Sequence, residues 1–191
     1  MYTFLKILLF IPLKLMCWGK LINKEKLPKK GEKSIIVCNH QSGWDIVILF
    51  TCLPFKVRFI GKQELASNKF KKWFFQSIGV IFVERNQVSL DSMKQILRAL
   101  RNNESICIFP EGKRNKTEEP LLEFKDGAEF IALKTKTPIL ITAIERKMRP
   151  FKVNKYTIIE KYECVQGINN TEIIKNKILK TIQGEHNEHN I

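Results

Sequence analysis

The sequence predicts an α/β domain with a mostly parallel central sheet flanked by helices, preceded by an N-terminal interfacial membrane helix. Short apolar runs typical of buried strands alternate with segments of helical period, the order that produces parallel sheets. The chain has 191 residues, enough for one domain with a sizeable core. Its composition, 44% hydrophobic and 27% charged, is typical of a globular protein and excludes a disordered binding platform.

Residues 1–23 are predicted to form a hydrophobic helix that anchors the protein to a membrane. The longest apolar run, residues 7–13, is far shorter than the roughly 20 residues that span a bilayer. Lys6 and Lys14 fall about 80° apart around a helix, so both can face water while apolar side chains face lipid. We therefore expect a peripheral or monotopic protein on the cytoplasmic face of a membrane. The alternative is an ordinary core helix.

The body is expected over residues 33–184. Residues 24–33 contain Pro28 and Gly31 and are typical of a linker. The apolar run at 34–39 suits a buried strand, and the apolar run at 46–53, which stops at Pro54, suits a helix. The next expected elements are a strand at 57–60, an aromatic and basic helix at 70–77 and a strand at 80–83.

Residues 89–101 form the clearest predicted helix, because one stripe holds Leu90, Met93, Leu97 and Leu100 and because Ser89 can cap the N-terminus. Beyond it we expect strands at 105–109 and 139–144, helices at 128–134 and 171–183, and a strand pair or one long edge strand at 152–164. Residues 185–191 are expected to be a polar tail.

The charge of the chain indicates an anionic partner. Lysine and arginine number 33 against 19 acidic residues, a formal net charge of +14. Such a surface attracts nucleic acid, anionic lipid headgroups or phosphorylated substrates. Residues 69–75 mix lysines with aromatic rings, which suits insertion among lipid headgroups. Stacking on single-stranded nucleic acid and a buried aromatic stripe are the alternatives.

The five cysteines are odd in number and form no C-x-x-C pair, so we expect reduced, buried thiols rather than a disulfide or zinc framework. Cys38 shares a strand face with His40, and a Cys–His nucleophile is the alternative to a structural thiol. His186 and His189 lie in the polar tail, where fraying is favoured over metal binding. No metal site is expected.

His40 is the one histidine in the predicted body, and Asp45 follows five residues later. A strand that ends at His40, a turn and a helix that starts near Trp44 can return the carboxylate to the imidazole. The carboxylate would then fix the tautomer and leave the other ring nitrogen as a base for an alcohol. The alternative is a capping box, Ser42-x-x-Asp45, in which Asp45 binds the backbone; both roles can coexist.

Two arginines follow predicted strands at the rim where ligands bind in open α/β sheets. In Phe109-Pro-Glu-Gly-Lys-Arg114, Gly112 permits a tight turn and Arg114 can grip a phosphate. Arg85 leaves the strand at 80–83 in the same way. Each arginine alone is typical of a solvated surface charge, whereas two arginines and His40 at successive strand exits indicate one shared site.

Six blocks in order resemble the 1-acylglycerol-3-phosphate acyltransferase family. Residues 39–45 (NHQSGWD) resemble its NHxxxxD block, the HX4D motif. Residues 59–65, 79–85 and 109–114 are similar to its F-I-x-K-x-E-L, G-x-x-F-x-x-R and FPEGTR blocks, and residues 124–128 and 137–139 to its F-K-x-G-A and V-P-I stretches. Lys113 and Asn115 depart from the Thr and Ser that are common in the family.

The resemblance implies a glycerolipid acyltransferase-like fold and the transfer of a fatty acyl group to the sn-2 hydroxyl of lysophosphatidic acid, which gives phosphatidic acid. His40 would take the hydroxyl proton and Asp45 would support it. The acceptor phosphate would be held by Lys62, Arg85 and Arg114, with Glu111 and Gly112 shaping the pocket.

The implied donor is acyl-CoA or acyl carrier protein, and no tightly bound cofactor is expected. The implied partners are a lysophospholipid and a membrane surface, not nucleic acid. The alternatives are acylation of another lysolipid and a non-catalytic basic protein that binds membrane or nucleic acid.

Overall fold

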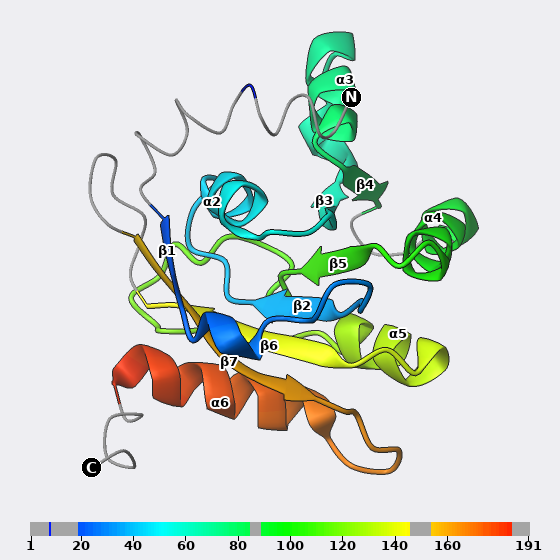
Figure 1. Cartoon of the computed structure of the whole chain (residues 1–191). Coiled ribbons are helices and arrows are strands. Elements are labelled where there is room, and N and C mark those ends of the chain that lie inside the picture. The colour runs from blue at the N-terminus through cyan, green and yellow to red at the C-terminus, as the bar shows by residue number, and fades with distance from the viewer. Residues whose placement is uncertain (1–7, 9–18, 85–88, 146–153, 185–191) are drawn as a thin grey trace.

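The computed structural model describes residues 8, 19–84, 89–145 and 154–184 (Figure 1). Its strands are β1 (Gly19–Ile22), β2 (Ile35–Cys38), β3 (Val57–Lys62), β4 (Val80–Val83), β5 (Ser105–Ile108), β6 (Ile139–Ile144) and β7 (Asn154–Tyr162). Its helices are η1 (Lys24–Lys26), α2 (Asp45–Cys52), η2 (Gln63–Ala66), α3 (Lys69–Ser77), α4 (Leu90–Arg101), α5 (Gly127–Thr135) and α6 (Asn170–Gln183).

The seven strands form one mixed sheet in the order β1-β7-β6-β2-β5-β3-β4. Neighbouring strands are parallel except β6 and β7, which are antiparallel. The prediction of a mostly parallel sheet with flanking helices is therefore confirmed for the run from β6 to β4. The two remaining strands, β7 and β1, run in the opposite direction.

Two sequence predictions are wrong at the β1 side of the sheet. Strand β7 is neither an edge strand nor a strand pair, because β1 pairs with it on one side and β6 on the other. Residues Gly19–Ile22 form β1, so the predicted anchor helix does not extend to residue 23. Residues 1–7 and 9–18 of that anchor, and the polar tail at 185–191, lie outside the described residues.

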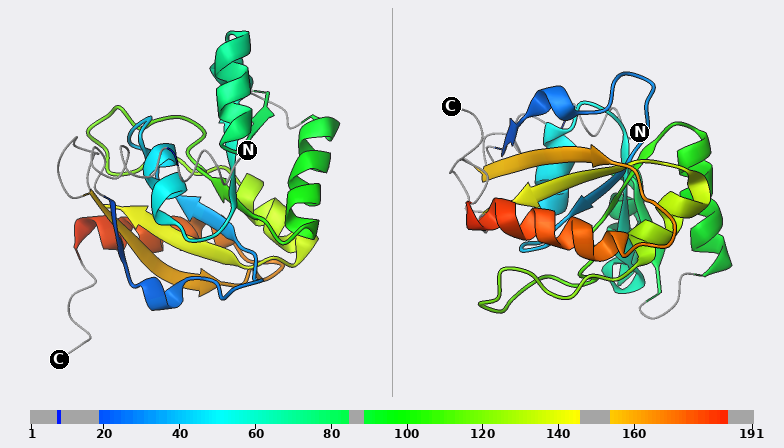
Figure 2. Two further views of the ribbon diagram at one scale, coloured as in Figure 1. Left: turned by 45° about the horizontal axis from the view of Figure 1, so that its top comes forward. Right: turned by 90° about the horizontal axis from the view of Figure 1, so that it is seen from below.

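The core lies on both faces of the sheet because alternate strand residues point to opposite sides. In β2, Ile36 and Cys38 pack in the cluster that α2 covers, whereas Ile35 and Val37 pack in the cluster under α4, α5 and α6 (Figures 1 and 2). Burial of each such aliphatic side chain stabilises the fold by about 1.5–3 kcal/mol. The central strands are apolar without alternation because both faces are covered.

Helix α4 confirms the cap that the sequence predicts and corrects the predicted apolar stripe. The Ser89 hydroxyl caps the helix by accepting the Ser92 N–H at 3.1 Å, as predicted. The predicted apolar stripe is confirmed at Leu100, which is buried, and wrong at its start, because Leu90 is 82% exposed and Ile96 is buried instead. Among the helices in the described ranges, none is both long and apolar enough to cross a bilayer.

Candidate active site

The ends of β2, β5 and β3 place the predicted site residues along one edge of the sheet. These strands are parallel neighbours, so their carboxyl ends meet at the same edge. His40 follows β2, residues 109–114 follow β5, and Lys62 is the last residue of β3. Arg85 lies just outside the described residues, so its predicted place in the site stays a prediction.

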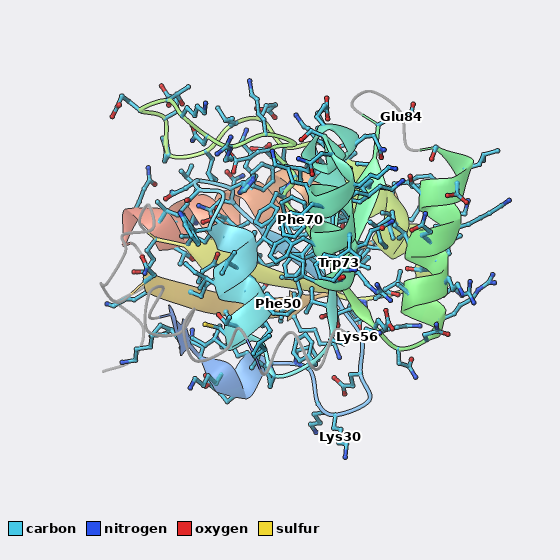
Figure 3. The ribbon with its side chains drawn as sticks, turned by 90° about the horizontal axis from the view of Figure 1, so that it is seen from above. Lys30, Phe50, Lys56, Phe70, Trp73 and Glu84 are labelled. Carbon is cyan, nitrogen blue, oxygen red and sulfur yellow. The ribbon has the colours of Figure 1, made fainter. Side chains whose placement is uncertain are left out.

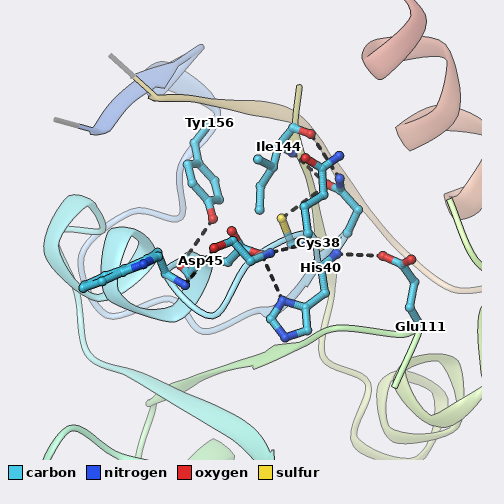
Figure 4. A network of polar contacts seen from close by, with 10 residues as sticks. Cys38, His40, Asp45, Glu111, Ile144 and Tyr156 are labelled. Carbon is cyan, nitrogen blue, oxygen red and sulfur yellow. Dashed lines mark hydrogen bonds and ion pairs between the residues drawn. The ribbon is translucent and has the colours of Figure 1, made fainter. Parts of the chain in front are cut away.

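His40 and Asp45 meet across the turn between β2 and α2. Nδ1 of His40 lies 2.9 Å from Oδ2 of Asp45 (Figure 4). The same oxygen accepts the backbone N–H groups of Gln41 and Ser42, each at 2.8 Å. Asp45 is fully buried as the first residue of α2. The carboxylate therefore contacts the imidazole and the backbone of the turn at once, whereas Ser42 does not cap α2 as the capping box would require.

This geometry sets the proton positions on the imidazole. Oδ2 of Asp45 already acts as an acceptor for two backbone N–H groups, so it is placed to accept the imidazole N–H as well. We therefore assign the proton of neutral His40 to Nδ1, which leaves the Nε2 lone pair available as a base. The ring stacks on Phe109, with centroids 4.2 Å apart and planes 21° apart, so its orientation is held by packing as well.

The buried carboxyl group of Glu111 joins the exits of two strands. Its Oε1 accepts the backbone N–H of His40 at 2.6 Å, and its Oε2 accepts the N–H of Leu122 at 3.0 Å (Figure 4). Glu111 is 3% exposed, and burial raises its pKa above the ordinary value. Its contacts position the backbone of the site.

Two further side chains that the sequence did not single out hold the turn. Asn39 pairs with Ile144 at the end of β6: its Nδ2 donates to the Ile144 carbonyl at 3.0 Å and its Oδ1 accepts the Ile144 N–H at 2.7 Å. The Tyr156 hydroxyl donates to the Asp45 carbonyl at 3.2 Å. Both contacts join residues more than 100 positions apart, so no local signal could have revealed them.

Basic side chains approach the same turns. A guanidinium nitrogen of Arg114 lies 3.6 Å from where a Cβ on Gly43 would stand, which puts Arg114 beside the turn between His40 and Asp45. Gly112 has φ +63°, and Nζ of Lys125 lies 3.6 Å from its Cβ position. Lys125 also donates its backbone N–H to the Pro110 carbonyl at 3.0 Å. Sequence reasoning missed Lys125, although it lies in one of the recognised blocks.

The departure at Asn115 has a structural explanation. Asn115 is 6% exposed, its Nδ2 donates to the Glu119 carbonyl at 2.7 Å, and its Oδ1 accepts the Thr117 N–H at 3.0 Å. Its backbone N–H donates to the His40 carbonyl at 2.7 Å. Asn115 therefore closes the loop after β5 and attaches it to the exit of β2. Lys113 is exposed.

The burial of Cys38 disfavours the alternative of a cysteine nucleophile. Cys38 is fully buried, and burial raises its pKa well above the ordinary value, which disfavours a thiolate nucleophile. Cys38, Cys107 and Cys164 are free thiols. Within the described part of the chain, no group of His, Cys, Asp and Glu could hold a metal ion. His186 and His189 lie outside that part.

Comparison with known proteins finds relatives in sequence and, separately, a solved structure with a similar fold. The acyltransferase family model matches residues 20–145. The 1-acyl-sn-glycerol-3-phosphate acyltransferase of Bacillus subtilis is 34% identical over 147 residues, covering 76% of this chain and 71% of that protein. The enzyme of the same name from Helicobacter pylori is 37% identical over 134 residues, and that from Saccharomyces cerevisiae 31% over 172.

The chain spans 55% of the length of the H. pylori enzyme and 52% of that of the yeast enzyme. Among solved structures, the 1-acyl-sn-glycerophosphate acyltransferase PlsC of Thermotoga maritima matches with a TM-score of 0.68 at 22% identity. The match covers 97% of this chain and 78% of that one, and it shows a shared fold.

Proposed function

This chain belongs to the acyltransferase family, and we propose that it acylates the sn-2 hydroxyl of 1-acyl-sn-glycerol-3-phosphate to give phosphatidic acid. The observation that carries the proposal is the contact of 2.9 Å between His40 Nδ1 and the buried Asp45 carboxylate, beside Arg114 at the rim of the sheet. The names of the similar enzymes supply the acceptor.

The reaction begins with a proton transfer to His40. Nε2 takes the proton of the sn-2 hydroxyl while the oxygen forms a bond to the carbonyl carbon of the acyl thioester. Asp45 keeps the imidazole in the Nδ1–H tautomer and stabilises the imidazolium that forms. General-base catalysis of this kind contributes about 10²–10⁴ to the rate.

Collapse of the tetrahedral intermediate completes the transfer. The carbon–sulfur bond breaks, the thiolate leaves and takes the proton from Nε2, and the products are an ester and a free thiol. His40 returns to its neutral form. Direct transfer needs no covalent acyl-enzyme, in keeping with the buried state of Cys38.

The acceptor phosphate is assigned to Lys62, Arg85 and Arg114. Arginine can bind a phosphate through two parallel N–H donors, and Arg114 is exposed next to the turn that holds His40. Lys125, beside Gly112, adds a further cation at the turn after β5. Glu111 and Gly112 shape the pocket, because the first holds the backbone and the second lets the chain turn.

The donor is proposed to be acyl-CoA or acyl carrier protein, and the enzyme is proposed to need no tightly bound cofactor. Its lipid substrate places it at a membrane, and we assign it to the cytoplasmic face as a peripheral or monotopic protein. Of the anchor predicted over residues 1–23, we assign residues 1–18 to the membrane, because β1 begins at Gly19.

The proposal is tested with purified protein, labelled acyl-CoA or acyl carrier protein, and a panel of lysolipids that differ in headgroup. We expect phosphatidic acid from the acceptor with a phosphate monoester, and little product from acceptors whose phosphate carries choline or ethanolamine. Equal rates with all headgroups would contradict the phosphate assignment. No turnover with any donor and acceptor would contradict the function.

A further inference from the structure

Helix α3 carries an aromatic and cationic surface that the proposed reaction does not use. The surface consists of Phe70 and Trp73 together with Lys69, Lys71 and Lys72. We propose that this surface, called here the α3 surface, docks the protein on an anionic lipid bilayer.

The helix is attached to the core by one end and leaves the other exposed. Phe74 and Phe75 pack against the cluster that α2 covers. Phe70, one turn before Phe74, and Trp73, immediately before it, are 72% and 48% exposed, with ring centroids 6.0 Å apart. Helix α3 projects from the body in Figures 1 and 2, and Figure 3 shows the two side chains along it. Two neighbouring aromatic rings are thus held in water by a folded helix.

Along the chain the charge next to these rings is of one sign, although Lys72 also lines a pocket with the carboxylates of Glu84 and Asp91. Lys69, Lys71 and Lys72 are exposed, and the sequence has no acidic residue between Glu64 and Glu84. Cations in the first turn of a helix oppose its dipole, so the lysines reduce the stability of α3. The Asn68 side chain compensates by capping Lys71 N at 2.8 Å. Lysines that disfavour their own helix are better explained by an anionic partner.

Lipid fits this surface better than a protein or nucleic acid does. Aromatic rings beside lysines can enter the headgroup layer while the ammonium groups reach lipid phosphates. Other large apolar residues exposed in the described helices have fewer cations beside them: Leu90 is followed by Asp91, and Phe130 has Lys134 over its ring, 5.5 Å from the centroid. Helix α3 also follows Lys62 through η2, so the surface is connected directly to the edge of the sheet that carries the site.

The inference rests on the proposed function in one respect, namely that the acceptor is a lipid in a bilayer. Vesicle flotation of the full chain tests docking without turnover. The vesicles contain phosphatidylcholine alone or phosphatidylcholine with phosphatidylglycerol. The two variants are Phe70→Ser/Trp73→Ser and Lys69→Gln/Lys71→Gln/Lys72→Gln. Their matched controls on other helices are Leu90→Ser/Phe130→Ser and Lys94→Gln/Arg98→Gln/Arg101→Gln.

Each lysine near an anionic surface is worth about a fivefold change in partitioning, so the triple lysine variant should bind anionic vesicles roughly a hundredfold more weakly. Its deficit should shrink as salt is added, because salt screens exposed charges. The aromatic variant should bind both vesicle types more weakly than the wild type, with the remaining binding supplied by the anchor proposed for residues 1–18, and the control variants should bind like the wild type. Wild-type binding in both α3 variants would overturn the inference and leave the proposed function intact.

Two further measurements separate docking from other roles of α3. The double variant Trp18→Phe/Trp44→Phe keeps Trp73 as its one tryptophan. Vesicles that contain brominated lipid should quench the fluorescence of Trp73, and unquenched fluorescence would overturn the inference. Turnover should fall in the α3 variants when lysolipid is embedded in vesicles and stay unchanged when it is dispersed in detergent. Loss of turnover in both conditions would overturn docking and favour a structural role for α3. Variants of α3 that bind vesicles like the wild type but lose binding to single-stranded RNA would overturn it in favour of a nucleic-acid partner.

Discussion

The Glu111 carboxylate accepts the backbone N–H of His40 over 2.6 Å, and its second oxygen accepts that of Leu122 over 3.0 Å. One buried side chain thereby joins the exit of β2, the exit of β5 and the loop that precedes α5. The position of the His40 ring relative to Arg114 depends on this junction. Glu111 is therefore a positioning residue that also contributes to the stability of the fold.

Glu111→Gln is expected to destabilise the fold by about 1–3 kcal/mol, because an amide can accept one backbone N–H but presents its own N–H to the other. The unfolding free energy from urea denaturation checks this. Glu118→Gln, at an exposed position of the same loop, is the control and should be neutral. Equal stability of the two variants would show that the Glu111 contacts contribute little.

The pH dependence of this difference has a definite sign. Burial raises the pKa of folded Glu111 above 4.5, so the native state binds the proton more tightly than the unfolded state. The contribution of Glu111 to stability is then largest below 4.5 and falls as pH rises through the raised pKa. The stability difference between wild type and Glu111→Gln should therefore shrink from acid to neutral pH. A difference that grows over this range would contradict the raised pKa.

Gly112→Ala is expected to cost about 1–2 kcal/mol, because φ +63° is unfavourable for a residue with a Cβ. The new methyl group would also stand 3.3 Å from Cε of Lys125 and shift that side chain. We expect a higher KM for the phosphate-bearing acceptor. Gly127→Ala is the control, since nothing lies within 4 Å of its Cβ position. A Gly112→Ala variant that matches this control in stability and KM would remove Gly112 from the site.

Cys38→Ala separates direct transfer from a covalent mechanism. Because Cys38 is fully buried and its pKa is raised, we expect the variant to keep its kcat while losing about 1 kcal/mol of stability through lost packing. Mass spectrometry of wild type mixed with the donor alone should find no acylated Cys38. An acyl-enzyme, or a folded but inactive variant, would favour a two-step mechanism through the thiol.

The elements that could be predicted from the sequence are those whose signals lie within the segment itself. Apolar runs and period gave β4 and β6 with their observed bounds, and Ser89 marked the start of α4. The edge position predicted for β7 failed because its partner is a four-residue strand at the other end of the chain. Nothing within either segment specifies that pairing.

The contacts of the site also divide into those that nearby residues predict and those that only the fold creates. The spacing of His40 and Asp45, with a turn between them, was enough to predict their contact, which lies within one turn of chain. The sheet order then brought Arg114 beside Gly43. The clamp from Asn39 to Ile144 and the bond from Tyr156 to Asp45 depend on long-range packing and could be found only in three dimensions.

The central claim is that the His40 imidazole, oriented by Asp45, removes the proton of the acceptor hydroxyl. The most direct test is the rate of acyl transfer to lysophosphatidic acid by His40→Ala, measured at saturating donor beside the unfolding free energy of the same sample. The account predicts a rate lower by about 10²–10⁴ in a variant that remains folded. A folded His40→Ala protein that forms phosphatidic acid as fast as wild type would contradict it.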